Sequence, residues 1–249
     1  MKPITLVQPG EARVCQLRVV GTTLTESVRD AGYLDAPSET RVDELPSAGA
    51  AERAVDERVA ALVEAGWRRG DDTPLYALLA AHAPWADWAR IAEEPKRLAE
   101  AWAFLDDPER LAALVERVTG AEVTDGALEL TLDGGRAITC ALPLAPALAA
   151  TAPASLRPLF ALHGGLWLDD DSVMAGSGFG PPEGDKEFEG TALEGAPVWW
   201  FLSEGTTRFT LASGERLYRW EHDGGLVEVP AERGPASLVL EALLAALED

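Results

Sequence analysis

The chain has 249 residues, of which 47% are hydrophobic, enough to build a buried core in one large domain or two small ones. Its formal net charge of −21 argues against nonspecific binding to nucleic acid or anionic membranes and favours a cationic partner. With no leader pattern and no apolar run of about 20 residues, the sequence predicts a cytoplasmic protein.

The negative charge is concentrated in the second part of the chain. Residues 1–72 hold 13 acidic and 9 basic residues, a net −4, which leaves −17 for residues 73–249. A second interpretation of the charge is the composition of a GC-rich bacterial genome, since Asn is absent and lysine occurs only three times. Both interpretations stay open at the level of sequence.

The first segment predicts strands followed by a helix. Polar and apolar residues alternate over residues 13–20, and weaker strand patterns cover residues 24–28 and 39–45. Ser47 is expected to cap a helix whose apolar stripe ends at Gly66.

This order of strands, helix and Gly-Trp resembles the WGR domain, known from poly(ADP-ribose) polymerases and from stand-alone bacterial proteins. The resemblance is carried by residues 15–21, 40–45 and 50–68. Residues 28–33 stand where the family has its Trp-Gly-Arg motif, but without the tryptophan. We therefore expect a WGR-like α+β domain over residues 1–72 and no direct binding of nucleic acid.

The middle of the chain predicts helices. Residues 75–82 form a short one, and residues 85–104 form a second that Pro95 interrupts. Asp106 or Asp107 is expected to cap a third, over residues 108–118. The tryptophans on these segments are expected in the core.

The remaining chain predicts mainly strands. A β-hairpin is expected over residues 127–142, followed by a helix that starts near Pro153 and ends with Gly164 or Gly165 in the left-handed conformation. Strands are expected over residues 166–168, 197–202, 206–212, 217–221 and 226–229, and a closing helix over residues 235–247.

The order of elements after residue 85 resembles the SUKH superfamily, which includes the fungal Smi/Knr regulators and many bacterial immunity proteins. The resemblance predicts an α+β fold in which the small antiparallel sheet and helix of the first domain are followed by a SUKH-like antiparallel sheet flanked by helices. Residues 73–249 would form this second domain, with helices at its N-terminal end. The segments that carry the resemblance are residues 142–143, 153–165, 198–202, 217–225 and 238–247.

The SUKH resemblance implies a non-enzymatic, protein-binding module. We expect an immunity protein that binds and occludes a cognate toxin, for example a nuclease, and the alternative is a regulatory or scaffolding adaptor with no toxin partner. Exposed aromatic character beside acidic residues makes Trp167, Asp169, Asp170, Asp171 and Phe179 the expected partner-binding residues.

The sequence gives little support for a catalytic or metal-binding site. His163 is expected to cap a helix or to pack at the surface, where the helix dipole favours positive charge, and His222 is expected in a turn. Cys15 and Cys140 lack CxxC spacing and are expected as buried thiols. The glycine-rich run at residues 176–180 is followed by two prolines and acidic residues, unlike a phosphate loop. We therefore expect no enzymatic activity, no cofactor and no metal.

Overall fold

The computed structural model divides the chain into two compact units, Met1–Ala86 (unit 1) and Asp87–Asp249 (unit 2). Residues 73–86 contain no Asp, Glu, Lys or Arg, so unit 2 carries the whole net charge of −17. The domain boundary between residues 72 and 73 stays a prediction. The structure describes residues 2–33, 36–70, 74–103, 107–124, 126–169, 171–175, 188, 190–194, 196, 198–204, 208–221, 225–230 and 234–248.

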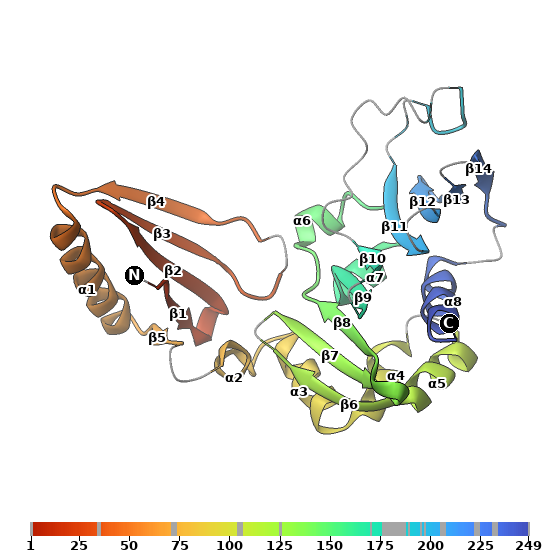
Figure 1. Ribbon diagram of the computed structural model, residues 1–249, viewed down its shortest axis with the longest axis horizontal. Coiled ribbons are helices and arrows are strands. Elements are labelled where there is room, and N and C mark those ends of the chain that lie inside the picture. The colour runs from red at the N-terminus through yellow and green to blue at the C-terminus, as the bar shows by residue number, and fades with distance from the viewer. Residues whose placement is uncertain are drawn as a thin grey trace. The chain divides into compact units, whose positions relative to one another are not determined.

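Unit 1 is a five-stranded antiparallel sheet, in the order β4-β3-β2-β1-β5, with one long helix, α1 (Figure 1). Strands β2, β3 and β4 and helix α1 confirm the elements predicted from the sequence, and β1 is added by the structure. The elements are β1 (Ile4–Gln8), β2 (Arg13–Val20), β3 (Thr23–Asp30), β4 (Glu39–Glu44), α1 (Ala48–Glu64), β5 (Arg68–Arg69) and α2 (Leu75–Leu79).

Helix α1 covers one face of this sheet. The Ser47 side chain accepts a hydrogen bond from the amide of Ala50 at 3.2 Å, which confirms the predicted cap. Apolar residues spaced along one helical face pack on the sheet because burying them removes apolar surface from water. The core beneath the helix contains Leu6, Cys15, Leu17, Leu62 and Trp67.

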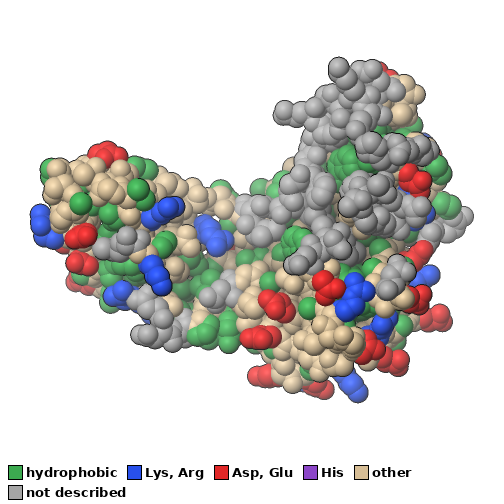
Figure 2. All heavy atoms as spheres, viewed as in Figure 1, with side chains coloured by type: hydrophobic (Ala, Val, Ile, Leu, Met, Phe, Trp, Pro, Cys, Tyr) green, Lys and Arg blue, Asp and Glu red, His purple; other side chains and the backbone are tan. Residues whose placement is uncertain are grey.

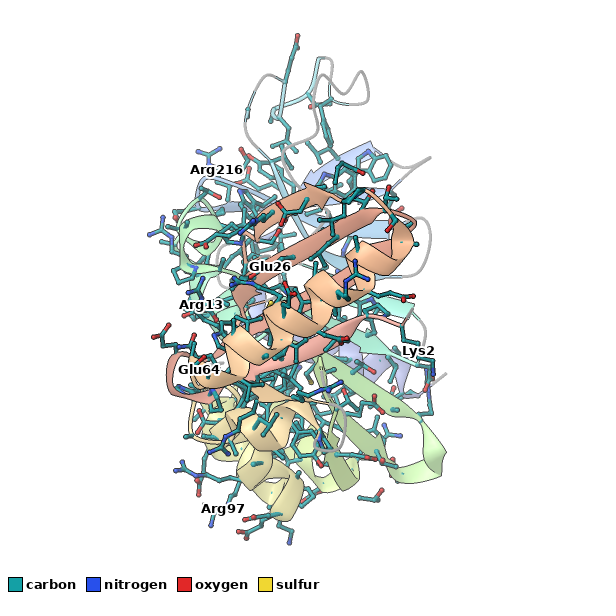
Figure 3. All side chains as sticks on the ribbon, turned by 90° about the vertical axis from the view of Figure 1, so that its left-hand side faces the viewer. Lys2, Arg13, Glu26, Glu64, Arg97 and Arg216 are labelled. Carbon is teal, nitrogen blue, oxygen red and sulfur yellow. The ribbon has the colours of Figure 1, made fainter. Side chains whose placement is uncertain are left out.

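A charged pair lies beside this core. The Arg58 guanidinium of α1 donates two hydrogen bonds to the Glu26 carboxylate of β3, at 2.7 and 2.6 Å. Figure 3 shows Glu26 next to the helix that lies across the sheet. Burial, and then the charge of Glu26, raise the pKa of the Cys15 thiol to about 11, so this thiol stays neutral at physiological pH.

Unit 2 contains two antiparallel sheets. The larger has five strands in the order β10-β9-β8-β7-β6, and the smaller has four in the order β11-β12-β13-β14 (Figure 1). The strands are β6 (Val118–Val123), β7 (Ala127–Leu132), β8 (Ala137–Ala141), β9 (Gly165–Leu168), β10 (Asp171–Ala175), β11 (Trp199–Glu204), β12 (Arg208–Ser213), β13 (Arg216–Glu221) and β14 (Gly225–Glu228).

In Figure 1, α3 and α4 lie behind β6 and β7 of the five-stranded sheet, and α5 lies beside them. Asp107 caps α5, accepting a hydrogen bond from the amide of Arg110 at 3.2 Å, and this confirms the predicted helix start. The helices are α3 (Trp85–Glu93, which begins in unit 1), α4 (Leu98–Ala101), α5 (Pro108–Arg117), α6 (Pro146–Ala149), α7 (Arg157–Leu162) and α8 (Pro235–Ala246).

The α+β class is confirmed, but the part after residue 73 holds two sheets where one was expected. The reason is long-range pairing: β9 pairs with β8, with Leu166 opposite Cys140 and Leu168 opposite Ile138. The predicted hairpin β7–β8 is thereby joined to β9 and β10 in one sheet, and β11–β14 form another. Residue alternation can predict a strand, but it does not select the neighbours of that strand.

Candidate functional site

The five-stranded sheet of unit 2 has one buried face and one open face. Leu128, Leu130, Ile138, Cys140 and Leu166 lie on the buried face with at most 3% of their surface exposed. Their sequence neighbours point the other way because side chains alternate across a strand. The open face therefore displays a row of residues that lie opposite one another on β6 to β9, namely Glu122, Glu129, Thr139 and Trp167.

Trp167 forms the aromatic part of this row. Its side chain is half-buried and folds back along β9 over Gly165, which lies two residues earlier on the same face. A Cβ atom added at Gly165 would lie 2.4 Å from Cη2 of the indole. Gly165 is thus required by the close approach of an aromatic ring, a pairing that also compensates for the missing side chain of a strand glycine.

The predicted role of the glycines at the helix end is wrong. Helix α7 ends at His163 in an extended conformation, with φ −140° and ψ 129°. Gly165 does not have the left-handed φ that a helix cap requires. The helix also begins at Arg157 rather than near Pro153. The strand β9 starts immediately after this corner because pairing with β8 continues through Gly164, whose amide donates to the Leu142 carbonyl at 2.8 Å.

Asp169 lies at the turn between β9 and β10, with a positive φ of 54°. Aspartate is one of the few residues that tolerate this conformation. Its carboxylate accepts hydrogen bonds from the Ala137 amide at 3.0 Å and from Nε of Arg136 at 2.9 Å. These bonds, the backbone one first, lower the pKa of Asp169 below its ordinary value. The carboxylate therefore already has two partners within the chain.

Two arginines bind the end of the closing helix α8, and one of them, Arg136, connects it to this turn. Arg136, which pairs with Asp169, also donates to the carbonyl of Ala246. Arg117 donates to the carbonyl of Leu247 at 3.2 Å. Cations are favoured at a helix C-terminus because the last carbonyls lack intrahelical partners. The network assigns Asp169 a structural role that its sequence context does not reveal.

Glu122 and Glu129 are the acidic part of the row. They lie directly opposite each other on β6 and β7, so their Cα atoms are about 5.5 Å apart, and both side chains are exposed. Neither carboxylate has an ion-pair partner within the described part of the chain. Since neighbouring strands are about 4.8 Å apart, Glu129 lies about 10 Å from Trp167 across the sheet.

Glu122 and Glu129 are not among the partner-binding residues expected from the sequence. The alternation over residues 127–132 does place Glu129 on the solvent side of a strand, but β6 and its pairing with β7 come from the structure. Figure 2 shows Asp and Glu side chains spread over the part of unit 2 that holds β6, β7 and α5. Lys and Arg side chains lie among them, and the net charge of unit 2 as a whole is −17.

His163 is buried, so the predicted surface or capping role is wrong. Only 2% of its surface is exposed, and its ring stacks on Trp88 and meets the edge of Trp102. Nε1 of Trp102 donates to Nε2 of His163 at 3.0 Å, while Nδ1 of His163 contacts the Ala141 carbonyl at 3.3 Å. Burial lowers the pKa of His163 to about 4, so the ring is neutral and its Nδ1 carries the proton.

Of the other expected partner-binding residues, the structure describes only Asp171. Asp171 is the first residue of β10 and its backbone pairs with Leu168. Asp170 and Phe179 lie outside the described residues, as does His222. The structure thus places Trp167 on the open face of the sheet and Asp169 in the turn that follows β9, and the partner-binding role of all five residues stays a prediction.

Gly165→Ala is expected to destabilise unit 2 by about 1 kcal/mol, because the new methyl group displaces the Trp167 indole from the sheet. Urea unfolding followed by tryptophan fluorescence measures the loss. In the double variant Gly165→Ala/Trp167→Ala the clash has no ring to act on, so the alanine at residue 165 should then cost almost nothing. Equal costs in both backgrounds would contradict the close approach.

Two further observations concern the described residues only. They contain no group of three or more His, Cys, Asp or Glu side chains arranged to hold a metal ion. Among them, no helix combines the length and the apolar character needed to cross a membrane. Both cysteines are buried and free, as predicted.

Comparison of the chain with protein-family models, with curated proteins and with solved structures found no significant match. The WGR and SUKH resemblances therefore stay predictions.

Proposed function

We propose that unit 2 is a protein-binding module whose open sheet face binds a cationic partner. The observation that carries this proposal is the row formed by Glu122, Glu129 and Trp167 on one solvent-facing surface. A tryptophan face attracts Arg and Lys side chains, and the carboxylates of Glu129 and Glu122, two and three strands away at about 10 and 14 Å, offer them ion pairs. An extended basic segment laid across β6 to β9 can reach both.

The opposed glutamates support this proposal energetically. Like charges directly opposite each other on neighbouring strands destabilise a sheet. A bound Arg or Lys would relieve the repulsion between Glu122 and Glu129, so partner binding and sheet stability would favour the same charge arrangement. The net charge of −17 on unit 2 would also speed the encounter with a cationic protein through long-range attraction.

The resemblance to SUKH immunity proteins indicates which kind of protein the cationic partner would be. The partner would be a toxin, for example a nuclease with a basic substrate groove. The open face that carries Glu122, Glu129 and Trp167, which we call the acidic face, would occlude that groove. Asp169 would contribute indirectly, by holding the turn beside Trp167 through its bonds to Arg136 and Ala137. In this form the module acts by binding and carries out no reaction of its own.

The test is an affinity measurement against the toxins encoded beside the gene, prepared as catalytically inactive proteins. Glu129→Lys and Trp167→Ala are each expected to weaken binding about tenfold or more, because each removes a central contact. Raising the salt concentration should slow association. The matched control is Glu116→Lys, the same charge change at an exposed position on α5, which is expected to alter affinity less than about threefold.

Unchanged affinity in Glu129→Lys and Trp167→Ala would overturn the assignment of this face. A different outcome is binding of a cationic protein that is not a toxin, with the same loss of affinity in Glu129→Lys and Trp167→Ala. That result would support this face as the binding surface and would indicate an adaptor rather than an immunity protein.

A further inference from the structure

Strand β4 is a free edge of the unit 1 sheet. It is the outermost strand in the order β4-β3-β2-β1-β5 and lies at the border of the sheet in Figure 1. All six of its residues are exposed or half-buried, and Val42 keeps 58% of its surface exposed. An edge strand of this kind presents unpaired backbone groups to which another strand can add.

The pairing with β3 fixes which backbone groups face outward. The amide of Leu45 donates to the carbonyl of Thr22 at 3.0 Å, one step beyond the last paired residues, Thr23 and Glu44. Because hydrogen-bonded pairs alternate in an antiparallel ladder, residues 43, 41 and 39 turn their N–H and C=O groups toward β3. Thr40, Val42 and Glu44 therefore point theirs away from the sheet.

The sequence of β4 is complementary to itself in one register. In an antiparallel pair of two β4 strands centred on Val42, each Arg41 faces Asp43 of the other copy and each Thr40 faces Glu44. The outward backbone groups of residues 40, 42 and 44 then bond to one another, as the ladder requires. The register centred on Arg41 sets Arg41 against Arg41, and the register centred on Asp43 sets Asp43 against Asp43.

Charge favours the same arrangement. Arg41 and Asp43 already form an ion pair within the strand at 2.9 Å, so two copies would place four charges of alternating sign side by side. Opposite-charge pairs across strands are stabilising, and like-charge pairs are destabilising. Unit 1 carries only −4 of the net charge of −21, so association through it brings the less charged parts together.

We propose that two copies of this chain associate through β4, antiparallel and centred on Val42, to join their unit 1 sheets into one. Six residues on each side make a small interface, so the dimer is expected to be concentration-dependent, with a dissociation constant in the micromolar range. This surface is separate from the acidic face of unit 2, and either proposal can fail alone.

A charge-swap series tests the register on the full chain by analytical ultracentrifugation. Arg41→Asp and Asp43→Arg should each weaken dimerisation about tenfold, since each places like charges opposite each other twice. The double variant Arg41→Asp/Asp43→Arg restores opposite charges and should recover the wild-type dimer. Arg18→Asp, the same charge change at an exposed residue of β2, is the matched control and should leave dimerisation unchanged.

Val42→Pro provides an independent test, because it removes an outward N–H while keeping the bonds to β3. It should abolish the dimer, and circular dichroism should show the fold retained. A wild-type chain that stays monomeric throughout the concentration series would overturn the proposal. A folded double variant that fails to recover the dimer lost in both single variants would overturn the register.

Discussion

Acidification from pH 6.5 to pH 4 is expected to destabilise unit 2 by on the order of 3 kcal/mol through His163 alone. In the unfolded chain this histidine takes up a proton near its ordinary pKa of 6.5, whereas burial lowers the pKa of the folded form to about 4. Between these values the unfolded state binds more protons than the folded state. The stability that the neutral His163 contributes to unit 2 is thus complete above pH 6.5. It declines as the pH falls and changes little further below pH 4.

The contacts of the two ring nitrogens explain why His163 resists protonation in the folded protein. Nε2 of His163 accepts the hydrogen bond of the Trp102 indole, and Nδ1 lies by the carbonyl of Ala141. A second proton on Nε2 would face the N–H of Trp102 and break this bond. Burial also deprives the charged ring of water, and this is the largest cause of the lowered pKa.

The measurement is urea unfolding at several pH values down to about pH 5, where roughly 2 kcal/mol of the loss is reached. His163→Gln keeps one acceptor and one donor but does not titrate, so its stability should fall less steeply with acidification, by about 1.4 kcal/mol per pH unit. Identical slopes in wild type and His163→Gln would refute the assignment.

Arg58→Met is expected to destabilise unit 1 by about 2 kcal/mol, because it leaves the Glu26 carboxylate buried without its counter-charge. The side chain of Glu26 is only 10% exposed, whereas that of Arg58 is 40% exposed. Water around the guanidinium reduces the effect below the roughly 3–5 kcal/mol that breaking a fully buried pair costs.

The double variant Glu26→Leu/Arg58→Met separates charge from packing. Replacing both partners by apolar residues removes the unpaired charge, so most of the lost stability should return. Arg53→Met, at an exposed position on the same helix, is expected to change stability by less than about 0.5 kcal/mol. Thermal unfolding of the four proteins provides the comparison. A double variant as unstable as Arg58→Met would show that the ion pair is not the cause.

Several elements of this fold follow directly from local sequence. The cap at Ser47 defines the start of α1, and Asp107-Pro108 defines the start of α5. The alternation of polar and apolar residues in β2 is typical of a half-buried strand. These patterns work because helix capping and side-chain alternation act between residues close in sequence.

The acidic face could be predicted only in part. Trp167 and Asp169 were recognisable beside an acidic turn, but the glutamates that complete the row lie some 40 residues earlier in the chain. The sequence likewise did not show that Asp169 is bound by Arg136, since these residues meet only through the pairing of β8 with β9.

The sequence by itself determined the α+β class, the burial of both cysteines and the concentration of negative charge in the second part of the chain. The tertiary structure decided that His163 is a neutral core residue rather than a helix cap, and that Gly165 makes room for an aromatic ring. Composition and local patterning are properties of the chain itself. The pKa of a histidine and the space beside a glycine depend on atoms that only folding brings into contact.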